Sequence, residues 1–392
     1  MRENLWLTER SGELVKLMII GIDGRFLLHG WLHPHSQLVD VLLRENARSP
    51  YPAKIVLYTN RPPEVHWAAK YEADNVVIRV LGKKGGRWRR LWWLWRTLPQ
   101  ALRADGVEVF YSSFYFLPPR VHGIRLVNSI HDCCVFYIPP ALNRGLLASP
   151  IYLRILKLAM RWTNRRSDRT VTVSNFSKRM LALHLNRSES RTAVCYHGVD
   201  NAAFRADLAR PGELKDCGEY SLFVGSNLPK KNITGLVQAY AQLPAEVRKK
   251  HLLVLKTSPY PEDHELIARL GLQSQVVFID RRLDEAEMRG LFKHAQVLLL
   301  MSYDEGFGLP IIEAFAAGVS VLVSKRAACG ELVPVDDYSA EPSDISEIAR
   351  KWERLVCDEE HRRRSLEWVA SRLPEFEQSV AARRFFETLS SW

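Results

Sequence analysis

The chain has 392 residues, which is more than one ordinary folded core holds and suits two domains of about 150–200 residues each. Hydrophobic residues make up 47% and charged residues 25%, as in globular domains, and no stretch approaches the ~20 apolar residues of a membrane-spanning helix. The net charge of +11 is divided unequally, with +16 in residues 1–210 and −5 in the remainder. This asymmetry predicts an anionic partner for the first half, such as a membrane surface, a nucleic acid or a phosphorylated acceptor.

The N-terminal segment has no apolar signal core, because charges lie on both sides of Leu5-Trp6-Leu7. We therefore expect residues 1–16 to be a frayed extension before the first strand. The six cysteines include no Cys-x-x-Cys pair, so neither a zinc site nor a disulfide framework is predicted. A reducing cytoplasm is the expected location.

Short apolar runs without polar alternation recur along the chain and predict buried parallel strands. Helical stretches between them indicate βαβ units, so we expect an α/β protein with two Rossmann-like, doubly wound domains that face each other across a cleft. The first set of predicted strands is Val15–Ile22, Ile55–Tyr58, Val76–Leu81, Val107–Tyr111, Leu126–Ile130, Thr170–Val173 and Ala193–Tyr196. The second set is Leu222–Val224, Leu252–Leu255, Val276–Ile279, Val297–Met301 and Val319–Val323.

The alternation of predicted strands and helices is interrupted at residues 204–218, where Pro211, Gly212 and Gly218 indicate a linker between the domains. The predicted boundaries are 1–204 for the N-terminal domain, 205–218 for the linker, 219–371 for the C-terminal domain and 372–392 for a C-terminal helix that could cross back to the first domain.

One loop has the features of an anion site. It follows the predicted strand Val297–Met301, and Gly306 and Gly308 let its backbone approach a ligand without a Cβ. Pro310 suits the first position of the next helix and Gly318 suits its end. Free backbone N–H groups and a helix N-terminus at a strand end fit a diphosphate.

Two carboxylates bracket this loop, Glu305 and Glu313. A diphosphate would repel them, so we expect them to bind hydroxyl groups of a sugar and a ribose. The alternative is that Glu313 complements the helix dipole and Glu305 is solvated. No Asp-x-Asp triplet is present to hold a divalent ion, which agrees with a site that has no catalytic metal.

The segment Glu305-Gly-Phe-Gly-Leu-Pro-Ile-Ile-Glu313 resembles the Glu-x7-Glu signature of family 4 glycosyltransferases, which are retaining enzymes with the two-domain GT-B fold. The resemblance covers roughly residues 17–350. Supporting matches are the strand–glycine–basic loop Leu222–Asn232, the segments Val173–Arg179 and His197–Asp200, and Ser129-Ile-His-Asp132.

The resemblance implies roles in binding a nucleotide sugar. Glu305 would contact the donor sugar and Glu313 the ribose. Backbone amides along Gly306, Phe307, Gly308 and Leu309 would face the donor sugar and the diphosphate.

The basic loop supplies the implied phosphate contacts. Lys231 matches the family's phosphate-binding lysine, and Lys230 is the neighbouring candidate. Many members carry an arginine after the glycine that corresponds to Gly225; this chain has Ser226 there, which weakens the phosphate grip or leaves Asn227 or a backbone amide to compensate. His131 matches a histidine near the reacting centre, and the alternative is a purely structural hydrogen bonder. His131, Glu305 and Lys231 are thus the implied catalytic residues.

The acceptor side is less defined. The family's glycine-rich loop corresponds to Gly21-Ile-Asp-Gly-Arg25, so Asp23, Gly24 and Arg25 are candidates. The next residues, His29-Gly-Trp-Leu-His-Pro34, depart from the compact turn of many relatives and leave the acceptor open.

Four tryptophans lie among six basic residues in Lys83–Arg96. On a helix, Trp88, Trp92 and Trp95 share one side, and with Arg89 they predict contact with an anionic membrane surface. The alternative is a helix whose tryptophans pack on the sheet. Interleaved aromatic and basic residues also occur in single-strand binders, but no nucleic-acid module accompanies them here.

We therefore expect a retaining, cofactor-independent glycosyltransferase that moves a hexose from a nucleotide diphosphate sugar to a glycan or lipid-linked acceptor in bacterial-type surface polysaccharide or glycolipid synthesis. It would work in the cytoplasm at the inner face of the cell membrane. GDP-mannose is weakly favoured over UDP-hexoses and dTDP-rhamnose. The alternatives are a nucleotide-sugar epimerase of the same fold and a catalytically silent binding subunit.

Overall fold

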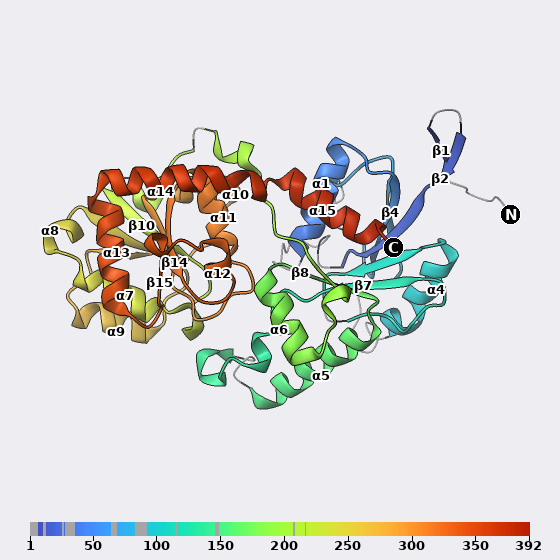
Figure 1. The fold of residues 1–392 in the computed structure, drawn as a ribbon, viewed down its shortest axis with the longest axis horizontal. Coiled ribbons are helices and arrows are strands. Elements are labelled where there is room, and N and C mark those ends of the chain that lie inside the picture. The colour runs from blue at the N-terminus through green and yellow to red at the C-terminus, as the bar shows by residue number, and fades with distance from the viewer. Residues whose placement is uncertain are drawn as a thin grey trace.

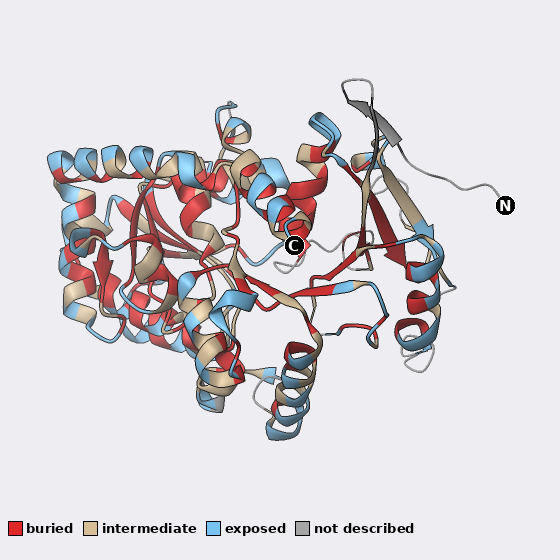
Figure 2. Cartoon of the chain, turned by 45° about the vertical axis from the view of Figure 1, so that its right-hand side comes forward, coloured by how far each residue is buried: buried red, intermediate tan, exposed pale blue. Residues whose placement is uncertain are grey.

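The computed structural model describes residues 7–10, 13–25, 27, 36–63, 69–82, 92–114, 116–145, 149–206, 208–215 and 217–392, with the backbone alone for 7–16. The described residues form two α/β lobes, each built on one sheet, and the C-terminal helix passes from one lobe to the other (Figure 1). In each lobe most strands are buried between helices (Figure 2).

The N-terminal lobe has a seven-stranded parallel sheet in the order β5-β4-β3-β6-β7-β8-β9. This order reverses between β3 and β6, as in a doubly wound sheet. The strands are β3 (Met18–Asp23), β4 (Ala53–Thr59), β5 (Val76–Val80), β6 (Val109–Ser112), β7 (Arg125–Ser129), β8 (Arg169–Thr172) and β9 (Thr192–Val194).

The C-terminal lobe repeats the plan in six parallel strands, in the order β12-β11-β10-β13-β14-β15, and reverses between β10 and β13. The strands are β10 (Glu219–Val224), β11 (His251–Lys256), β12 (Val276–Phe278), β13 (Val297–Leu300), β14 (Ser320–Ser324) and β15 (Ser339–Ala340). The predicted doubly wound α/β class is thereby confirmed.

Helices cover both sheets. In the N-terminal lobe they are α1 (Gln37–Arg48), the π-helix η2 (Trp93–Thr97), α4 (Leu98–Ala104), α5 (Pro150–Arg166) and α6 (Asn175–Leu185). In the C-terminal part they are α7 (Ile233–Gln242), α8 (Ala245–Arg248), α9 (Pro261–Arg269), α10 (Glu285–Lys293), α11 (Leu309–Ala317), α12 (Ala327–Leu332), α13 (Ile345–Cys357), α14 (Glu359–Arg372) and α15 (Gln378–Ser390). Within the described residues, none of these helices has the length and apolar character needed to span a bilayer.

The N-terminus differs from the expectation of a frayed extension. Strands β1 (Leu7–Arg10) and β2 (Glu13–Lys16) pair in antiparallel register, with Leu7 opposite Lys16 and Arg10 opposite Glu13. Pairing lets the backbone groups of the two short segments bond to each other instead of to water. The predicted strand Val15–Ile22 is consequently two strands, since β2 ends at Lys16 and β3 begins at Met18.

The C-terminal helix joins the lobes. Between α14 and α15 the backbone bonds to the segment after β9: Val199 N–H donates to the Phe376 carbonyl at 2.9 Å, and Gln378 N–H donates to the Val199 carbonyl at 3.1 Å. Helix α15 then packs on α1, where Tyr51 and Phe386 stack with ring centroids 4.4 Å apart. The chain therefore crosses between the lobes twice, and the two crossings are bonded together.

Because the two crossings lie in contact at Gly198, adding one methyl group there should destabilise the fold. In Gly198→Ala the new Cβ would lie 2.7 Å from the Ala381 Cβ and 2.9 Å from the Gln378 Cα, so α15 would have to shift. We expect the free energy of unfolding, measured in urea, to fall by about 1–3 kcal/mol. Gly212→Ala is the matched control, because its Cβ would meet nothing within 4 Å. Equal stability of the two variants would contradict this account of the crossing.

Candidate active site

The candidate site lies at the point where the strand order of the C-terminal sheet reverses. The loop after β10 carries Gly225 to Lys231, and the loop after β13 carries Asp304 to Gly308. Since β10 and β13 are parallel neighbours, both loops leave the same edge of the sheet side by side. Ligands of doubly wound sheets bind in the crevice at this edge.

Two of the predicted residues meet there as an ion pair. Lys231 Nζ contacts Glu305 Oε1, and the side chains are 15% and 13% exposed, so the pair is largely shielded from solvent. Ser302 Oγ donates to the same carboxylate oxygen at 3.1 Å. Tertiary structure thus joins a residue of the basic loop to one of the Glu-x7-Glu segment, 74 positions away.

A second charged pair lies beside the first and was not predicted. Lys230 is buried, with Nζ 3.7 Å from Asp304 Oδ2, and Tyr137 of the N-terminal lobe donates its hydroxyl to Asp304 Oδ1 at 2.6 Å. Burial, with added repulsion from Asp132, raises the pKa of Asp304 to about 6, although Lys230 and Tyr137 act in the opposite direction. Both lysines are therefore held by carboxylates, and neither is a solvated surface residue.

His131 reaches the same region from the N-terminal sheet, since it follows β7 by two residues. Its side chain is buried and lies edge-on to His197, with ring centroids 5.1 Å apart. His197 in turn lies edge-on to Phe307 at 5.1 Å. One cluster of rings thus links the histidine of one lobe to the glycine-rich loop of the other.

Gly306 is a point of direct contact between the lobes. Its carbonyl accepts hydrogen bonds from Ser174 Oγ at 2.7 Å and from Ser177 Oγ at 3.2 Å. Any Cβ at this position would lie 2.7 Å from the His131 carbonyl and 3.0 Å from the Asp132 Cβ. Glycine is therefore required because the two backbones touch.

The N-terminus of α6 is capped from the opposite lobe. Glu331 of α12 accepts from the backbone N–H groups of Asn175 at 2.8 Å and Phe176 at 2.7 Å, and from the Tyr196 hydroxyl at 2.7 Å. A carboxylate there satisfies helical N–H groups that lack intrahelical partners and complements the helix dipole. The contact fixes α6, and with it Ser174 and Ser177, against the glycine-rich loop.

Helix α11 begins at Leu309, one residue before Pro310, which was the predicted first position. Gly308 has φ of +101°, a conformation that favours glycine, and serves as the N-cap. Pro310 follows at the second helical position, where a missing N–H leaves no bond unmade. Ser226 is exposed, and the neighbouring Asn227 side chain is engaged by the Ser258 carbonyl at 3.1 Å and by Asp263 at 2.6 Å.

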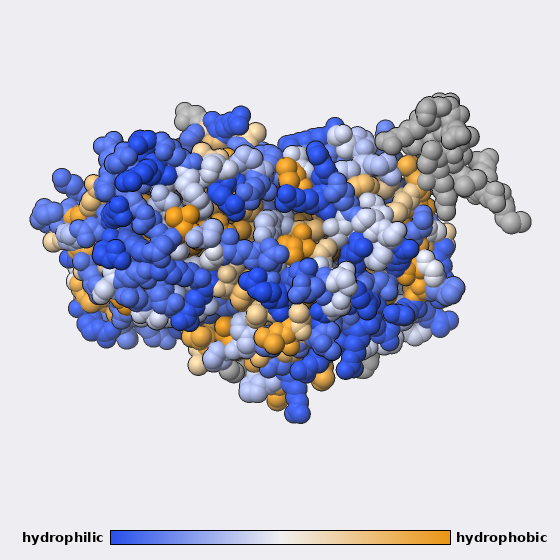
Figure 3. Space-filling view, in the orientation of Figure 1, coloured by the Kyte–Doolittle hydropathy of each residue, from blue (hydrophilic) through white to orange (hydrophobic). Residues whose placement is uncertain are grey.

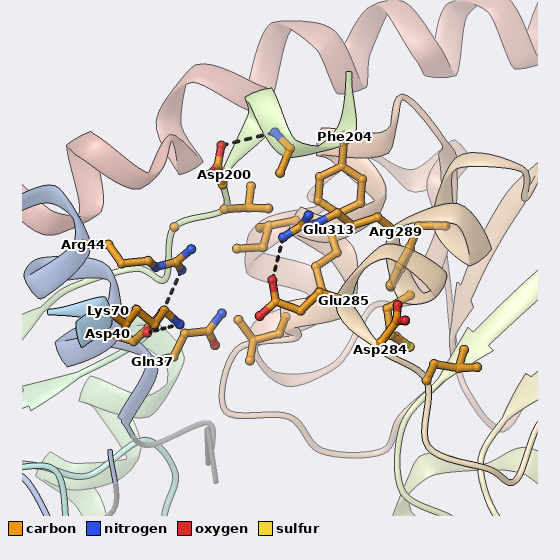
Figure 4. Close-up of a pocket in the computed structure, with 18 residues that line it drawn as sticks. Gln37, Asp40, Arg44, Lys70, Asp200, Phe204, Asp284, Glu285, Arg289 and Glu313 are labelled. Atoms are coloured by element: carbon orange, nitrogen blue, oxygen red, sulfur yellow. Dashed lines mark hydrogen bonds and ion pairs between the residues drawn. The ribbon is translucent and has the colours of Figure 1, made fainter. Parts of the chain in front are cut away.

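The Glu313 side chain lines a pocket of about 370 Å³ between the lobes (Figure 4). Leu309 and Glu313 line it from α11, and α10 and α1 form other walls. Two ion pairs flank the space, Arg289–Glu285 at 2.8 Å and Arg44–Asp40 at 2.8 Å. Burial raises the pKa of Glu313 to about 7, and among the described residues no hydrogen bond or ion pair to its carboxyl group is found. A half-buried carboxylate facing a pocket can accept hydrogen bonds from a ligand's hydroxyl groups.

Two of the predicted acceptor-side residues, Asp23 and Arg25, form an ion pair with each other. Arg25 donates from Nε to Asp23 Oδ1 at 2.9 Å and from Nη2 to Oδ2 at 2.6 Å, and its guanidinium lies over the Trp93 ring at 4.5 Å. Gly24 N–H donates to the Tyr58 carbonyl at 2.9 Å. This two-bond geometry holds the loop in place, so it supports a structural role for Asp23 and Arg25.

Of the predicted membrane residues, Trp88 and Arg89 lie outside the described part of the chain, as does His29–Pro34. Trp92 and Trp95 are exposed, whereas Trp93 between them is buried against the sheet. The structure thus places Trp93 in the core and leaves Trp92 and Trp95 at the surface.

Five residues with no role predicted from the sequence make the hydrogen bonds that join the two lobes at the site. They are Asp304, Tyr137, Ser174, Ser177 and Glu331. Asp304 is an acidic neighbour of Glu305, and Ser174 has the polar residue and spacing of a helix N-cap, so these two carried a local signal. Tyr137 and Glu331 carried none, because their partners lie in the other lobe. Within the described ranges, no group of three or more His, Cys, Asp or Glu side chains is arranged to hold a metal ion.

Comparison with known proteins gives matches over both lobes. Residues 40–203 match the model of Glycosyltransferase Family 4, and residues 205–367 match that of Glycosyl transferases group 1. O-antigen chain mannosyltransferase B of Escherichia coli is 28% identical over 268 residues, which cover 64% of this chain and 65% of that protein. O-antigen chain mannosyltransferase RfbU of Salmonella typhimurium is 24% identical over 315 residues, 79% of this chain and 80% of that protein.

Solved structures show the same architecture. HepE of Anabaena, in complex with UDP and glucose, superposes with a TM-score of 0.68 at 17% identity over 96% of this chain and 100% of that one. The matches cover both lobes, and the Glu-x7-Glu loop lies at the sheet's reversal point. The chain therefore belongs to the family 4 glycosyltransferases and has their two-domain GT-B fold.

Proposed function

We propose that this protein is a retaining hexosyltransferase that transfers a sugar from a nucleotide diphosphate donor held against the C-terminal lobe. The observation that carries the proposal is the Lys231–Glu305 pair, which is largely shielded from solvent at the crevice edge of the sheet, near the start of α11. A cation beside a helix N-terminus suits a diphosphate, and a neighbouring carboxylate suits sugar hydroxyl groups.

In the proposed reaction the bond between the anomeric carbon and the diphosphate oxygen breaks, and a bond to an acceptor oxygen forms on the same face of the sugar. The acceptor hydroxyl gives its proton to the leaving phosphate. Lys231 and the amides of Phe307, Gly308 and Leu309 stabilise the charge that grows on the diphosphate, without a metal ion or a cofactor. Glu305 orients the sugar, and His131 supports it from the opposite lobe.

Donor entry would exchange one partner of Lys231 for another. In this structure Glu305 pairs with the Lys231 ammonium group. A bound diphosphate would draw Lys231 toward itself and leave the Glu305 carboxylate for the sugar hydroxyl groups. The pair therefore keeps both charges satisfied before the substrate arrives.

Glu313 is the proposed ribose ligand, because its carboxylate faces the pocket between the lobes. Leu309 would pack on the nucleoside beside it. Gly225 gives the nucleotide's phosphates close access to the basic loop, where Lys230, held by Asp304, adds positive potential.

For the donor we propose GDP-mannose, because both relatives described above are mannosyltransferases. The O-antigen role of those relatives also supports a glycan or lipid-linked acceptor in surface polysaccharide or glycolipid synthesis. Such acceptors would place the protein in the cytoplasm, at the inner face of the cell membrane.

The epimerase and silent-subunit alternatives differ in what becomes of the donor. A transferase slowly releases free sugar from its donor, an epimerase returns an isomerised nucleotide sugar, and a silent subunit does neither. The Glu305–Glu313 loop favours the transferase, because it resembles the signature of that family and lies within the matched residues 205–367.

The first test neutralises Glu305 without removing its volume. Glu305→Gln should lower kcat for transfer by roughly 100- to 1000-fold, because the amide no longer offers a charged acceptor in the transition state. Circular dichroism and the urea midpoint should stay close to those of the unchanged protein. Glu359→Gln, at an exposed position of α14, is the control for loss of one carboxylate. Full turnover in Glu305→Gln would refute the assignment of this loop.

The raised pKa of Glu313 predicts a pH dependence that Glu313→Gln removes. A carboxyl group whose pKa rises from 4.5 to about 7 on folding opposes the fold when it ionises. The penalty is absent below pH 4.5, grows between pH 4.5 and about 7, and is full above that range. The Tm of Glu313→Gln relative to the unchanged protein should therefore increase with pH across this window. A difference that is independent of pH would count against a carboxyl buried at this site.

The donor is tested by thermal shift with a panel of nucleotide sugars. A ligand that binds the folded state raises Tm according to its concentration relative to Kd. GDP-mannose should raise Tm more than UDP-glucose or dTDP-rhamnose does, and the shift should shrink in Glu313→Gln. A larger shift with another donor would replace mannose in the proposal while leaving the reaction type intact.

A further inference from the structure

Helix α5 presents a stripe of large apolar side chains to solvent. Ile151, Ile155 and Leu158 are 75%, 61% and 58% exposed, and the half-buried Trp162 continues their row. Spacings of four, three and four residues place these positions on one side of the helix. An outward row of this kind is unusual in a protein that satisfies its apolar surface internally.

The stripe is not the packing face of the helix. Leu153 and Met160, on the other side of α5, are buried in a cluster with Ile130, Cys133 and Cys134. The helix is therefore anchored by one apolar face while a second is left uncovered. Its anchoring cluster includes both chain neighbours of the segment that carries His131 and Asp132.

Trp95 of η2 extends the stripe, and Trp92, the residue before η2, lies three positions away on the same side of that turn. Trp92 and Trp95 are 61% and 52% exposed, and Trp95 stacks on Trp162 with ring centroids 5.9 Å apart. We call these six residues the α5 face: Trp92, Trp95, Ile151, Ile155, Leu158 and Trp162. Together with Tyr152, its exposed members account for six of the eleven exposed large hydrophobic side chains in the described part of the chain.

The borders of the α5 face are positively charged. Helix α5 has no acidic residue and five basic ones: Arg154, Lys157, Arg161, Arg165 and Arg166. Arg166 lies over the Trp162 ring at 4.2 Å, and Arg96 lies over the Trp92 ring at 5.5 Å. Along the lower edge of Figure 3, hydrophobic and hydrophilic side chains mix over the region that α5 and α6 occupy in Figure 1.

We propose that the α5 face docks on an anionic lipid bilayer, with α5 lying in the plane of the interface. Its aliphatic row would enter the acyl boundary, the tryptophans would lie at the level of the headgroups, and the arginines would bind lipid phosphates. This inference rests on the proposed location at the membrane and assigns the surface that makes the contact.

The chemistry of the face disfavours other occupants. Two copies meeting through this face would bring two sets of five cations together, with no acidic residue on either helix to offset them. A nucleic acid would engage the arginines but leave the row of isoleucine and leucine without an apolar partner. A bilayer with anionic headgroups offers phosphates to the arginines and an apolar interior to the isoleucine and leucine row.

The test is co-sedimentation of the full chain with vesicles, either of phosphatidylcholine alone or of phosphatidylcholine mixed with phosphatidylglycerol. The protein should bind the mixed vesicles and bind phosphatidylcholine much more weakly. Ile155→Ser with Leu158→Ser should weaken binding roughly tenfold or more by removing apolar contact. Arg154→Glu with Arg165→Glu should weaken it by at least as much, and binding of the unchanged protein should fall with added salt.

Matched controls lie in the other lobe. Leu270→Ser replaces an exposed leucine, and Arg364→Glu reverses an exposed arginine on α14; neither should change vesicle binding. If the unchanged protein ignores anionic vesicles, or if the α5 variants bind as it does, the proposal is wrong. Dimers that dissociate in Ile155→Ser with Leu158→Ser would equally overturn it in favour of self-association.

Catalysis is measured separately, so that the two proposals can fail independently. Glu305→Gln should retain vesicle binding while losing transfer. Ile155→Ser with Leu158→Ser should retain slow donor hydrolysis in solution but should no longer bind vesicles. Loss of donor hydrolysis in the α5 variants, with the fold intact, would mean that these residues serve the active site and not a membrane.

Discussion

The contact between the Gly306 carbonyl and the first turn of α6 is the constraint on which the rest of the site depends. Ser174 and Ser177 hold that carbonyl from the N-terminal lobe, and no space remains for a Cβ because the His131 backbone lies against it. Gly306 directly follows Glu305, so the position of one carboxylate is determined by an interlobe hydrogen bond. The glycine-rich loop is thereby held in place by both lobes.

Several charged groups at the boundary between the two lobes have a partner of opposite charge or a hydrogen-bond partner. Lys231 with Glu305, Lys230 with Asp304, and Glu331 with the N-terminus of α6 all lie at or near it. Burying charged groups is favourable only when each has a partner. An opening motion would break several interlobe bonds, each worth about 0.5–1.5 kcal/mol, so opening and closing would be coupled to substrate contacts that replace them. Helix α15 keeps the lobes joined throughout such a motion.

Much of the architecture could be predicted because it depends on local patterns. Uninterrupted apolar runs predicted the strands of both sheets, and glycine and proline placed the loop before α11, since those residues constrain the backbone wherever they stand. The two-residue strand β15 was missed because it is too short to leave a pattern. The β1–β2 hairpin was missed because its residues lack strong alternation, and only pairing with each other makes them strands.

The sequence by itself determined the fold class, the two-lobe division and the loops that form the proposed donor site, because hydrophobic periodicity and backbone-constraining residues act over a few positions. Only the tertiary structure decided which charges pair. It joined Lys231 to Glu305 and Tyr137 to Asp304, and it turned Asp23 and Arg25 toward each other. It also placed Trp93 in the core and left Trp92 and Trp95 in solvent. Such choices depend on the distance between side chains far apart in the chain, and that distance exists only once the sheets have packed.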